Sequence, residues 1–184
     1  MQTAEAEPER DALRHRLSAT LRDVPDFPKP GIVFKDITPV LESAALLRDV
    51  IAAMAAPWLG QAITHVAGIE SRGFIFGVPV ALALGAGFIP IRKPRKLPWR
   101  TVAQDYALEY GTDRLEMHVD ACPASSRVLL VDDVLATGGT ASAACQLIGR
   151  LGGNVVGCSF LIAISALKGV ARLEGCCVDT LVEV

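Results

Sequence analysis

Two adjacent carboxylates mark the segment of the sequence best suited to chemistry. Val131–Thr140 reads Val-Asp-Asp-Val-Leu-Ala-Thr-Gly-Gly-Thr. This order predicts a buried strand, an acidic pair, a loop of small residues and the beginning of a helix. Small residues in Ala136–Thr140 let backbone N–H groups approach a phosphate, and the positive end of the helix attracts the same anion. The loop residues that we predict to bind phosphate are Ala136, Thr137, Gly138, Gly139 and Thr140.

The acidic pair, Asp132 and Asp133, requires a different partner. Two carboxylates would repel a phosphate held by the neighbouring loop. Sugar hydroxyls donate hydrogen bonds to carboxylates, and a divalent cation is a second possible partner. A ligand with a phosphate at one end and a diol in its middle satisfies both parts of the motif. A ribose 5-phosphate has this chemistry.

Other phosphate-binding motifs fit the sequence less well. The P-loop pattern GxxxxGK[ST] is absent. The segment Gly85–Pro90 begins like a dinucleotide fingerprint, but it lacks the sixth small residue and precedes a predicted strand where the fingerprint requires a helix.

Basic residues gather between positions 92 and 100, where five of nine positions are Lys or Arg and none is acidic. Runs of charge usually form a solvated face. This run follows a predicted strand directly, and Pro94 and Pro98 stiffen it, which favours a site for an anion. Its basic residues are Arg92, Lys93, Arg95, Lys96 and Arg100.

The elements that position these residues alternate between strand and helix. Apolar runs and periodicity predict strands over Thr64–Ile69, Phe88–Arg92, Val128–Val131, Val155–Ile164 and Val178–Val182. They predict helices over Asp11–Arg22, Ser43–Ala56, the residues after Gly73, the segment ending at Leu151, and Ala166–Leu173. A hairpin is predicted from Tyr106–Tyr110 and Arg114–Val119 across a turn at Gly111–Asp113. The alternation predicts an α/β fold with a mostly parallel sheet flanked by helices, and ligands bind such sheets beyond the carboxyl ends of the strands.

Length and composition limit the class of protein. The 184 residues, 51% of them hydrophobic, suggest a single domain over 1–184 with a substantial core. A net charge of −2 gives no support for a nucleic-acid or membrane-surface binder. The longest uncharged stretch, Phe74–Ile91, is interrupted by Gly and Pro, which favours a helix, a turn and a strand over a membrane span.

The cysteines and the N-terminal residues point to a cytoplasmic protein. The five cysteines include no CxxC pair, so neither a disulfide framework nor a zinc site is indicated. Cys145 and Cys158 lie in apolar patterns and are interpreted as small core residues. The first ten residues are acidic and contain no apolar segment of a secretory signal.

At Val131–Thr140 the chain resembles the type I phosphoribosyltransferases, whose phosphoribosyl-pyrophosphate motif is a strand, two acids and a TGGT-like loop. Four further segments resemble the adenine-using members, in the same order along the chain: Phe27–Asp36, Arg72–Gly77, Arg92–Pro98 and Tyr106–Gly111. The resemblance extends from about Phe27 to the end of the chain. It implies conversion of adenine and phosphoribosyl pyrophosphate to AMP and pyrophosphate in purine salvage.

The resemblance also implies roles for particular residues. It assigns Arg72, Arg92 and Lys96 to the pyrophosphate side, where the basic run adds Lys93. Phe34 is expected to stack on adenine while the backbone of Val33 and Lys35 reads the polar edge of the base. Many relatives have Arg at position 35, and a role through the main chain is compatible with Lys.

The predicted hairpin corresponds to a mobile flap in the family. Residues 93–119 would form the basic loop and the flap, and 1–35 an N-terminal helix and a small base-binding hood. Glu109 would handle the proton of the purine imidazole ring, and Tyr106 and Tyr110 would shield the site from water.

The family further implies magnesium, held by substrate oxygens and water with no protein ligand, and a homodimer. Two other functions are compatible with the residues: a phosphoribosyltransferase for a 6-oxopurine, and a regulator that binds phosphoribosyl pyrophosphate without catalysis.

Overall fold

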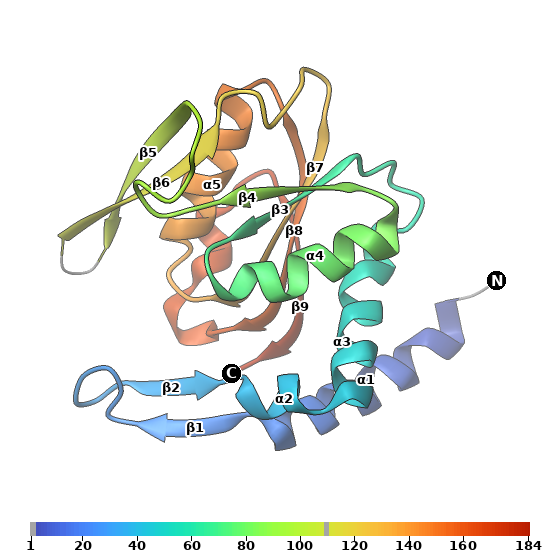
Figure 1. Cartoon of the computed structure of the whole chain (residues 1–184). Coiled ribbons are helices and arrows are strands. Elements are labelled where there is room, and N and C mark those ends of the chain that lie inside the picture. The colour runs from blue at the N-terminus through green and yellow to red at the C-terminus, as the bar shows by residue number, and fades with distance from the viewer. Residues whose placement is uncertain (1–2, 109–110) are drawn as a thin grey trace. The chain divides into compact units, whose positions relative to one another are not determined.

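A computed structural model describes residues 3–108 and 111–184, and their secondary structure is drawn in Figure 1. The chain divides into two compact units, Met1–Ala53 and Met54–Val184, each described here by itself. The prediction of a single domain over 1–184 stays a prediction.

The first unit contains helices and a two-stranded antiparallel sheet. Its elements are α1 (Thr3–Thr20), β1 (Arg22–Pro25), β2 (Val33–Asp36), α2 (Thr38–Glu42) and α3 (Ala44–Ala55), whose last two residues belong to the second unit. α1 begins eight residues before its predicted start, because the Ala- and Glu-rich segment ahead of Asp11 favours helix as well. The predicted helix over Ser43–Ala56 is confirmed to within one residue at each end.

The second unit is built on a five-stranded sheet. Its strands are β3 (His65–Ile69), β4 (Gly87–Ile91), β7 (Arg127–Leu135), β8 (Asn154–Ala163) and β9 (Cys177–Glu183). They lie in the order β4-β3-β7-β8-β9, and every neighbouring pair is parallel, which confirms the predicted sheet. The direction of the connections reverses between β3 and β7. In open α/β sheets a crevice for ligands forms at that reversal.

Two helices cover opposite faces of this sheet (Figure 1). α4 (Arg72–Leu84) connects β3 to β4, and α5 (Gly139–Arg150) connects β7 to β8. Right-handed crossovers that lead in opposite directions place their helices on opposite faces. α5 covers a core of fully or almost fully buried apolar side chains: Ile69, Leu130, Leu147, Ile148 and Phe160.

The uncharged stretch Phe74–Ile91 consists of most of α4, a turn and β4, as predicted. Gly85 ends α4 in the left-handed conformation, with φ of 64°, which glycine adopts at little cost. Within the described part of the chain, every helix is too short or too polar to cross a membrane.

The hairpin forms, but its predicted turn is wrong. β5 (Thr101–Leu108) pairs antiparallel with β6 (Gly111–His118), and Tyr106 lies opposite Asp113. The residues predicted as the turn, Gly111–Asp113, therefore belong to β6. Alternation with a period of two identifies strands but does not fix which residues pair across them.

The predicted helix over Ala166–Leu173 is also wrong. The segment forms two short 3-10 helices, η2 (Ser165–Leu167) and η3 (Gly169–Arg172). Lys168 separates them with φ of 51°, outside the range of a right-handed helix. A third 3-10 turn, η1 (Ala56–Trp58), follows α3.

Candidate active site

The acidic pair lies within strand β7. Asp132 and Asp133 were predicted to follow the strand, but β7 continues through both to Leu135 because β8 pairs with it that far. The pair lies beside the reversal between β3 and β7, so the topology places it at the expected ligand crevice.

Asp133 is buried and forms an ion pair with Arg72, the first residue of α4. The Arg72 Nε lies 2.8 Å from Asp133 Oδ2, and the exposed fractions of the two side chains are 37% and 5%. Burial raises the pKa of Asp133, although the Arg72 charge opposes the shift. The ion pair therefore joins the segment after β3 to the ligand end of β7.

Asp132 is the more exposed of the two acids. Its Oδ1 accepts a hydrogen bond of 2.9 Å from the backbone N–H of Asp133. Burial and the neighbouring charge of Asp133 raise the pKa of Asp132. A hydroxyl or a cation of a ligand would stabilise the charge of a carboxylate in this position.

Helix α4 approaches this pair closely because residue 73 is glycine. A Cβ at Gly73 would lie 2.8 Å from Asp132 Oδ1 and 2.9 Å from the carbonyl oxygen of Val131. Glycine thus allows the first turn of α4 to pack on the end of β7.

The predicted phosphate loop leads directly into α5. Gly138 has φ of 79°, and its carbonyl accepts the N–H of Ser142 at 2.9 Å, in the first turn of the helix. The N–H groups of the first helical turn are available to an anion in such a geometry. Two glycines fix the other side of the loop: a Cβ at Gly138 would collide with the carbonyl of Gly169, and a Cβ at Gly169 with that of Ala136. The contact with Gly169 was not predicted, because it joins residues about thirty positions apart.

Arg92 is held by a carboxylate that the sequence analysis did not assign to the site. Its Nε and Nη2 donate to the two carboxylate oxygens of Glu70 at 3.1 and 3.0 Å, and the backbone N–H of Lys93 donates to Glu70 Oε2 at 3.0 Å. These interactions lower the pKa of Glu70, and the Arg92 hydrogen bond is the main cause. Arg92 Nη1 also donates to the carbonyl of Lys96 at 2.9 Å. The guanidinium is fixed relative to the segment after β3.

Lys93 connects the basic loop to the hairpin. Its Nζ donates to the Tyr106 hydroxyl at 2.9 Å and forms an ion pair with Asp113. Burial disfavours the ammonium, but the hydrogen bonds to Asp113 and Tyr106 outweigh it and raise the pKa of Lys93. Tyr106 also donates to Asp113 Oδ2 at 3.1 Å.

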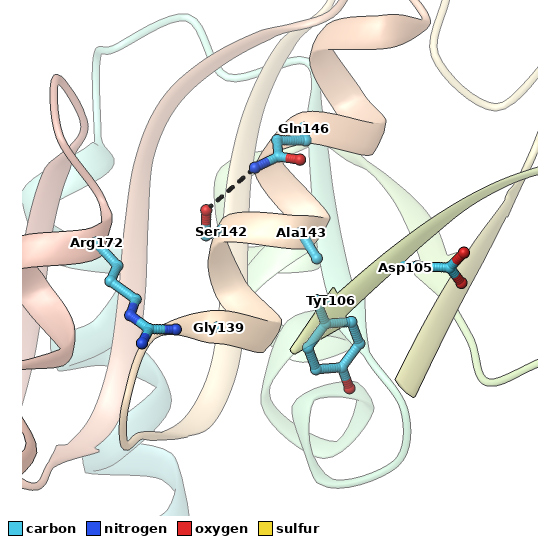
Figure 2. A pocket seen from close by; sticks show the side chains of 7 residues that line it. All are labelled: Asp105, Tyr106, Gly139, Ser142, Ala143, Gln146 and Arg172. Carbon is cyan, nitrogen blue, oxygen red and sulfur yellow. Dashed lines mark hydrogen bonds between the residues drawn. The ribbon is translucent and has the colours of Figure 1, made fainter. Parts of the chain in front are cut away.

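A cavity of about 210 Å³ lies between the hairpin and α5 (Figure 2). Tyr106 and Asp105 line it from β5, Gly139 and Ser142 from the first turns of α5, and Arg172 from η3. In Figure 2 the guanidinium of Arg172 extends toward Gly139, at the beginning of α5. Ligand sites usually occupy about 300–1,000 Å³, so this cavity is large enough for one part of a substrate only.

The residues expected to bind the base lie in the first unit. Phe34 packs edge-on against Phe27, with ring centroids 5.2 Å apart. Lys35 Nζ donates to Asp23 Oδ1 at 2.6 Å, so its side chain is engaged within the unit. Val33 is 51% exposed. These features are compatible with recognition of a ligand by the Phe34 ring and the strand backbone.

The structure therefore brings together most of the predicted site residues of the second unit in two groups. Arg72 pairs with Asp133, which lies next to Asp132 and just before the loop, while Arg92, Lys93 and Lys96 meet around Glu70. Glu109 and Tyr110 lie outside the described residues. Arg172, Gly169 and Glu70 were missed, because only the fold brings them to the site.

The donor set at the acidic pair fits magnesium held through a ligand. Among residues 3–108 and 111–184, one group of three or more His, Cys, Asp or Glu side chains is arranged to hold an ion, and it consists of cysteines away from this pair. A Mg²⁺ ion usually keeps several waters and uses one or two carboxylates plus phosphate oxygens. The two carboxylates are compatible with that mode.

Comparisons with known proteins agree with this geometry. A family model described as "Phosphoribosyl transferase domain" matches residues 36–179. The adenine phosphoribosyltransferase of Myxococcus xanthus is 61% identical over 157 residues, which cover 85% of each chain. The solved adenine phosphoribosyltransferase of Rhodothermus marinus is 52% identical, with a TM-score of 0.91, and the match covers 95% of this chain and 99% of that one.

A more distant structure includes ligands. The adenine phosphoribosyltransferase of Saccharomyces cerevisiae, complexed with an imino-altritol bisphosphate and adenine, is 38% identical, with a TM-score of 0.88, and the match covers 93% of this chain and 99% of that one. The family model spans most of this chain, and the identities extend over nearly all of the relatives. The chain belongs to the adenine phosphoribosyltransferases, a branch of the phosphoribosyltransferase family.

Proposed function

We propose that this enzyme converts adenine and phosphoribosyl pyrophosphate to AMP and pyrophosphate, a reaction of purine salvage. The bond between ribose C1 and the pyrophosphate oxygen breaks, and a bond between C1 and a nitrogen of adenine forms. The observation that carries the proposal is the acidic pair of β7, paired with Arg72 and followed directly by the glycine loop at the N-terminus of α5.

The acidic pair and the loop bind the ribose 5-phosphate. The loop Ala136–Thr140 offers backbone N–H groups and two hydroxyls to the 5-phosphate. Asp132 and Asp133 accept hydrogen bonds from the ribose hydroxyls, which compensates for the cost of their burial. Such contacts fix C1 where the base must attack.

The leaving pyrophosphate is stabilised by Arg72, Arg92, Lys93 and Lys96. Negative charge grows on this group as its bond to C1 breaks, so fixed cations stabilise the transition state more than the bound substrate. Glu70 holds the Arg92 guanidinium through two hydrogen bonds, which reduces the reorganisation that the reaction requires.

The base is held by Phe34 and by the backbone of Val33 and Lys35. Glu109 accepts the proton that adenine loses when its ring nitrogen attacks C1. Tyr106 and Tyr110 close the hairpin over the site and exclude water, which would otherwise hydrolyse the reactive sugar. The place of Tyr106 beside the cavity and α5 supports this role.

Three further features belong to this proposal. Mg²⁺, held by oxygens of phosphoribosyl pyrophosphate and by water, would neutralise part of the pyrophosphate charge. The active form is a homodimer, and the protein works in the cytoplasm, on small molecules and without nucleic acid or membrane. Removal of free Mg²⁺ with a chelator should abolish turnover, and excess Mg²⁺ should restore it. Full activity without a divalent ion would contradict the magnesium requirement.

A steady-state assay over free bases tests the reaction itself. With phosphoribosyl pyrophosphate and Mg²⁺, adenine should give AMP at a higher kcat/KM than hypoxanthine, guanine or xanthine. If a 6-oxopurine were converted as well as adenine or better, adenine would be wrong as the proposed substrate. Binding of phosphoribosyl pyrophosphate without product from any base would instead indicate a regulator.

A further inference from the structure

Three cysteines from distant parts of the sequence meet on the α5 side of the sheet. Cys145 lies in α5, Cys158 in β8, and Cys176 immediately before β9, three neighbouring elements in Figure 1. The three Sγ atoms all lie within 4.8 Å of one another. Cys145 Sγ and Cys158 Sγ are 3.8 Å apart. None of the three belongs to the candidate active site described above.

The three cysteines of the cluster differ in burial. Cys158 is fully buried in the core beneath α5. Cys145 and Cys176 are half-buried and pack against the edge of the same core. An ion that approaches from solvent would meet these two thiols first, and Cys158 would form the base of the site.

The spacing suits a thiophilic metal ion. Metal–sulfur bonds of about 2.3 Å place tetrahedral sulfur ligands about 3.8 Å apart. The Cys145–Cys158 separation has this value, and the remaining separations require shifts of about 1 Å or less by the half-buried Cys176 and Cys145. Sulfur ligands favour soft ions such as Zn²⁺ over Mg²⁺, so this site would not compete with the ion of the reaction.

We propose that Cys145, Cys158 and Cys176 form a binding site for one Zn²⁺ ion, separate from the active site. Three metal–sulfur bonds form, the three thiol protons are released to solvent, and no group is oxidised or reduced. A water molecule takes the fourth position on the exposed side, because zinc prefers four ligands.

The ion would cross-link α5, β8 and the beginning of β9. Metal bound only to the folded state stabilises that state by mass action. α5 begins at the phosphate loop, so the cross-link also restrains the helix that carries Gly139 and Thr140. The stabilisation is independent of substrate binding.

Cd²⁺ is a suitable probe, because cadmium–thiolate bonds absorb at longer ultraviolet wavelengths than zinc–thiolate bonds do. The full chain is reduced with a non-thiol reductant and freed of metal. One sample is titrated with Cd²⁺, and a second is first loaded with one Zn²⁺ per chain and then titrated with Cd²⁺. We expect one Cd²⁺ per chain, the absorbance of three cadmium–thiolate bonds, displacement of the bound Zn²⁺ by the softer Cd²⁺, and a higher Tm with either ion.

Variants locate the site. Cys145→Ser and Cys176→Ser should each lose about one third of the absorbance and bind at least about tenfold more weakly, since each removes one of three ligands. Cys177→Ser is the matched control, because Cys177 is adjacent to Cys176 but exposed and outside the cluster. This variant should bind as the unchanged chain does.

Several results would overturn the proposal. One is the absence of a cadmium–thiolate absorbance in the folded chain. Another is a loss of absorbance in Cys177→Ser equal to the loss in Cys145→Ser or Cys176→Ser. A third is Cd²⁺ binding of unchanged affinity in both Cys145→Ser and Cys176→Ser. A disulfide between Cys145 and Cys158 that persists under reduction, detected as two missing thiols, would likewise show that these sulfurs bind each other and not a metal.

Discussion

The guanidinium of Arg72 in helix α4 forms an ion pair with the carboxylate of Asp133 in strand β7, and the two residues are more than fifty positions apart in the sequence. Arg72 Nε lies 2.8 Å from Asp133 Oδ2, and this contact links the beginning of α4 to the ligand end of β7. Both residues also belong to the proposed sites for ribose and pyrophosphate. The ion pair therefore holds these two proposed subsites next to each other before any substrate binds.

Arg72→Ala should lower the free energy of unfolding, because it leaves the buried Asp133 carboxyl without this partner. We expect a loss of about 1–3 kcal/mol, below that for a fully buried pair because the Arg72 side chain is 37% exposed. Adding Asp133→Asn should recover part of the loss. Urea denaturation of the single and double variants measures the coupling energy between Arg72 and Asp133. Strictly additive changes in the free energy of unfolding would contradict a stabilising ion pair.

Asp132→Asn should raise the Tm at pH 7 while it weakens the binding of phosphoribosyl pyrophosphate. Burial and the Asp133 charge raise the pKa of Asp132 above the ordinary 3.8, so the folded state binds this proton more tightly than the unfolded state does. Stability is then lost as the pH rises from about 3.8 through the folded pKa. The Tm advantage of the variant should shrink toward zero near pH 4, which thermal melts across pH would show. An advantage that is constant with pH would rule out this cause.

Glu70→Gln should weaken both stability and the pyrophosphate site. The hydrogen bonds of Arg92 lower the pKa of Glu70 in the folded state, so the stability they contribute is present above about pH 4.5 and lost as the pH falls through the folded pKa. At pH 7 the variant should unfold more easily by about 1–3 kcal/mol. The difference should fall as the pH decreases below 4.5. Exposed Glu174 supplies the control: Glu174→Gln should leave stability within about 0.5 kcal/mol at both pH values.

Gly169→Ala should impair substrate binding through the phosphate loop. The added Cβ would collide with the carbonyl of Ala136 and displace the loop. We expect the KM for phosphoribosyl pyrophosphate to rise by about tenfold or more, with a smaller effect on the KM for adenine. Gly149→Ala, on α5 in open space, is the matched control and should leave both constants unchanged. A similar KM for phosphoribosyl pyrophosphate in both variants would contradict the role of Gly169 in holding the phosphate loop.

Glu109→Gln should lower kcat far more than it changes the KM for adenine. A general acid or base contributes about 10²–10⁴-fold to the rate, and the amide cannot accept the proton. Steady-state kinetics at saturating phosphoribosyl pyrophosphate measure the effect. A reduction of less than about tenfold would exclude the proton role.

The sequence by itself determined the architecture and most of the proposed ligand residues. The apolar runs of β3, β7 and β8 are long and local, so their periodicity predicts buried parallel strands without knowledge of the partners. The motif Val131–Thr140 is local as well, because a strand, an acidic pair and a glycine loop must be contiguous to place a phosphate at a helix N-terminus.

Only the tertiary structure decided which of these residues are paired and which other residues support them. Glu70 meets Arg92, and Gly169 meets Ala136, across separations in sequence that no periodicity records. The register of the hairpin, in which Asp113 belongs to β6 and not to the turn, depends on contacts between the two strands. The three clustered cysteines likewise come from three separate parts of the fold. Local patterns specify elements because backbone hydrogen bonds and side-chain periodicity are local, whereas contacts between elements exist only once the sheet has assembled.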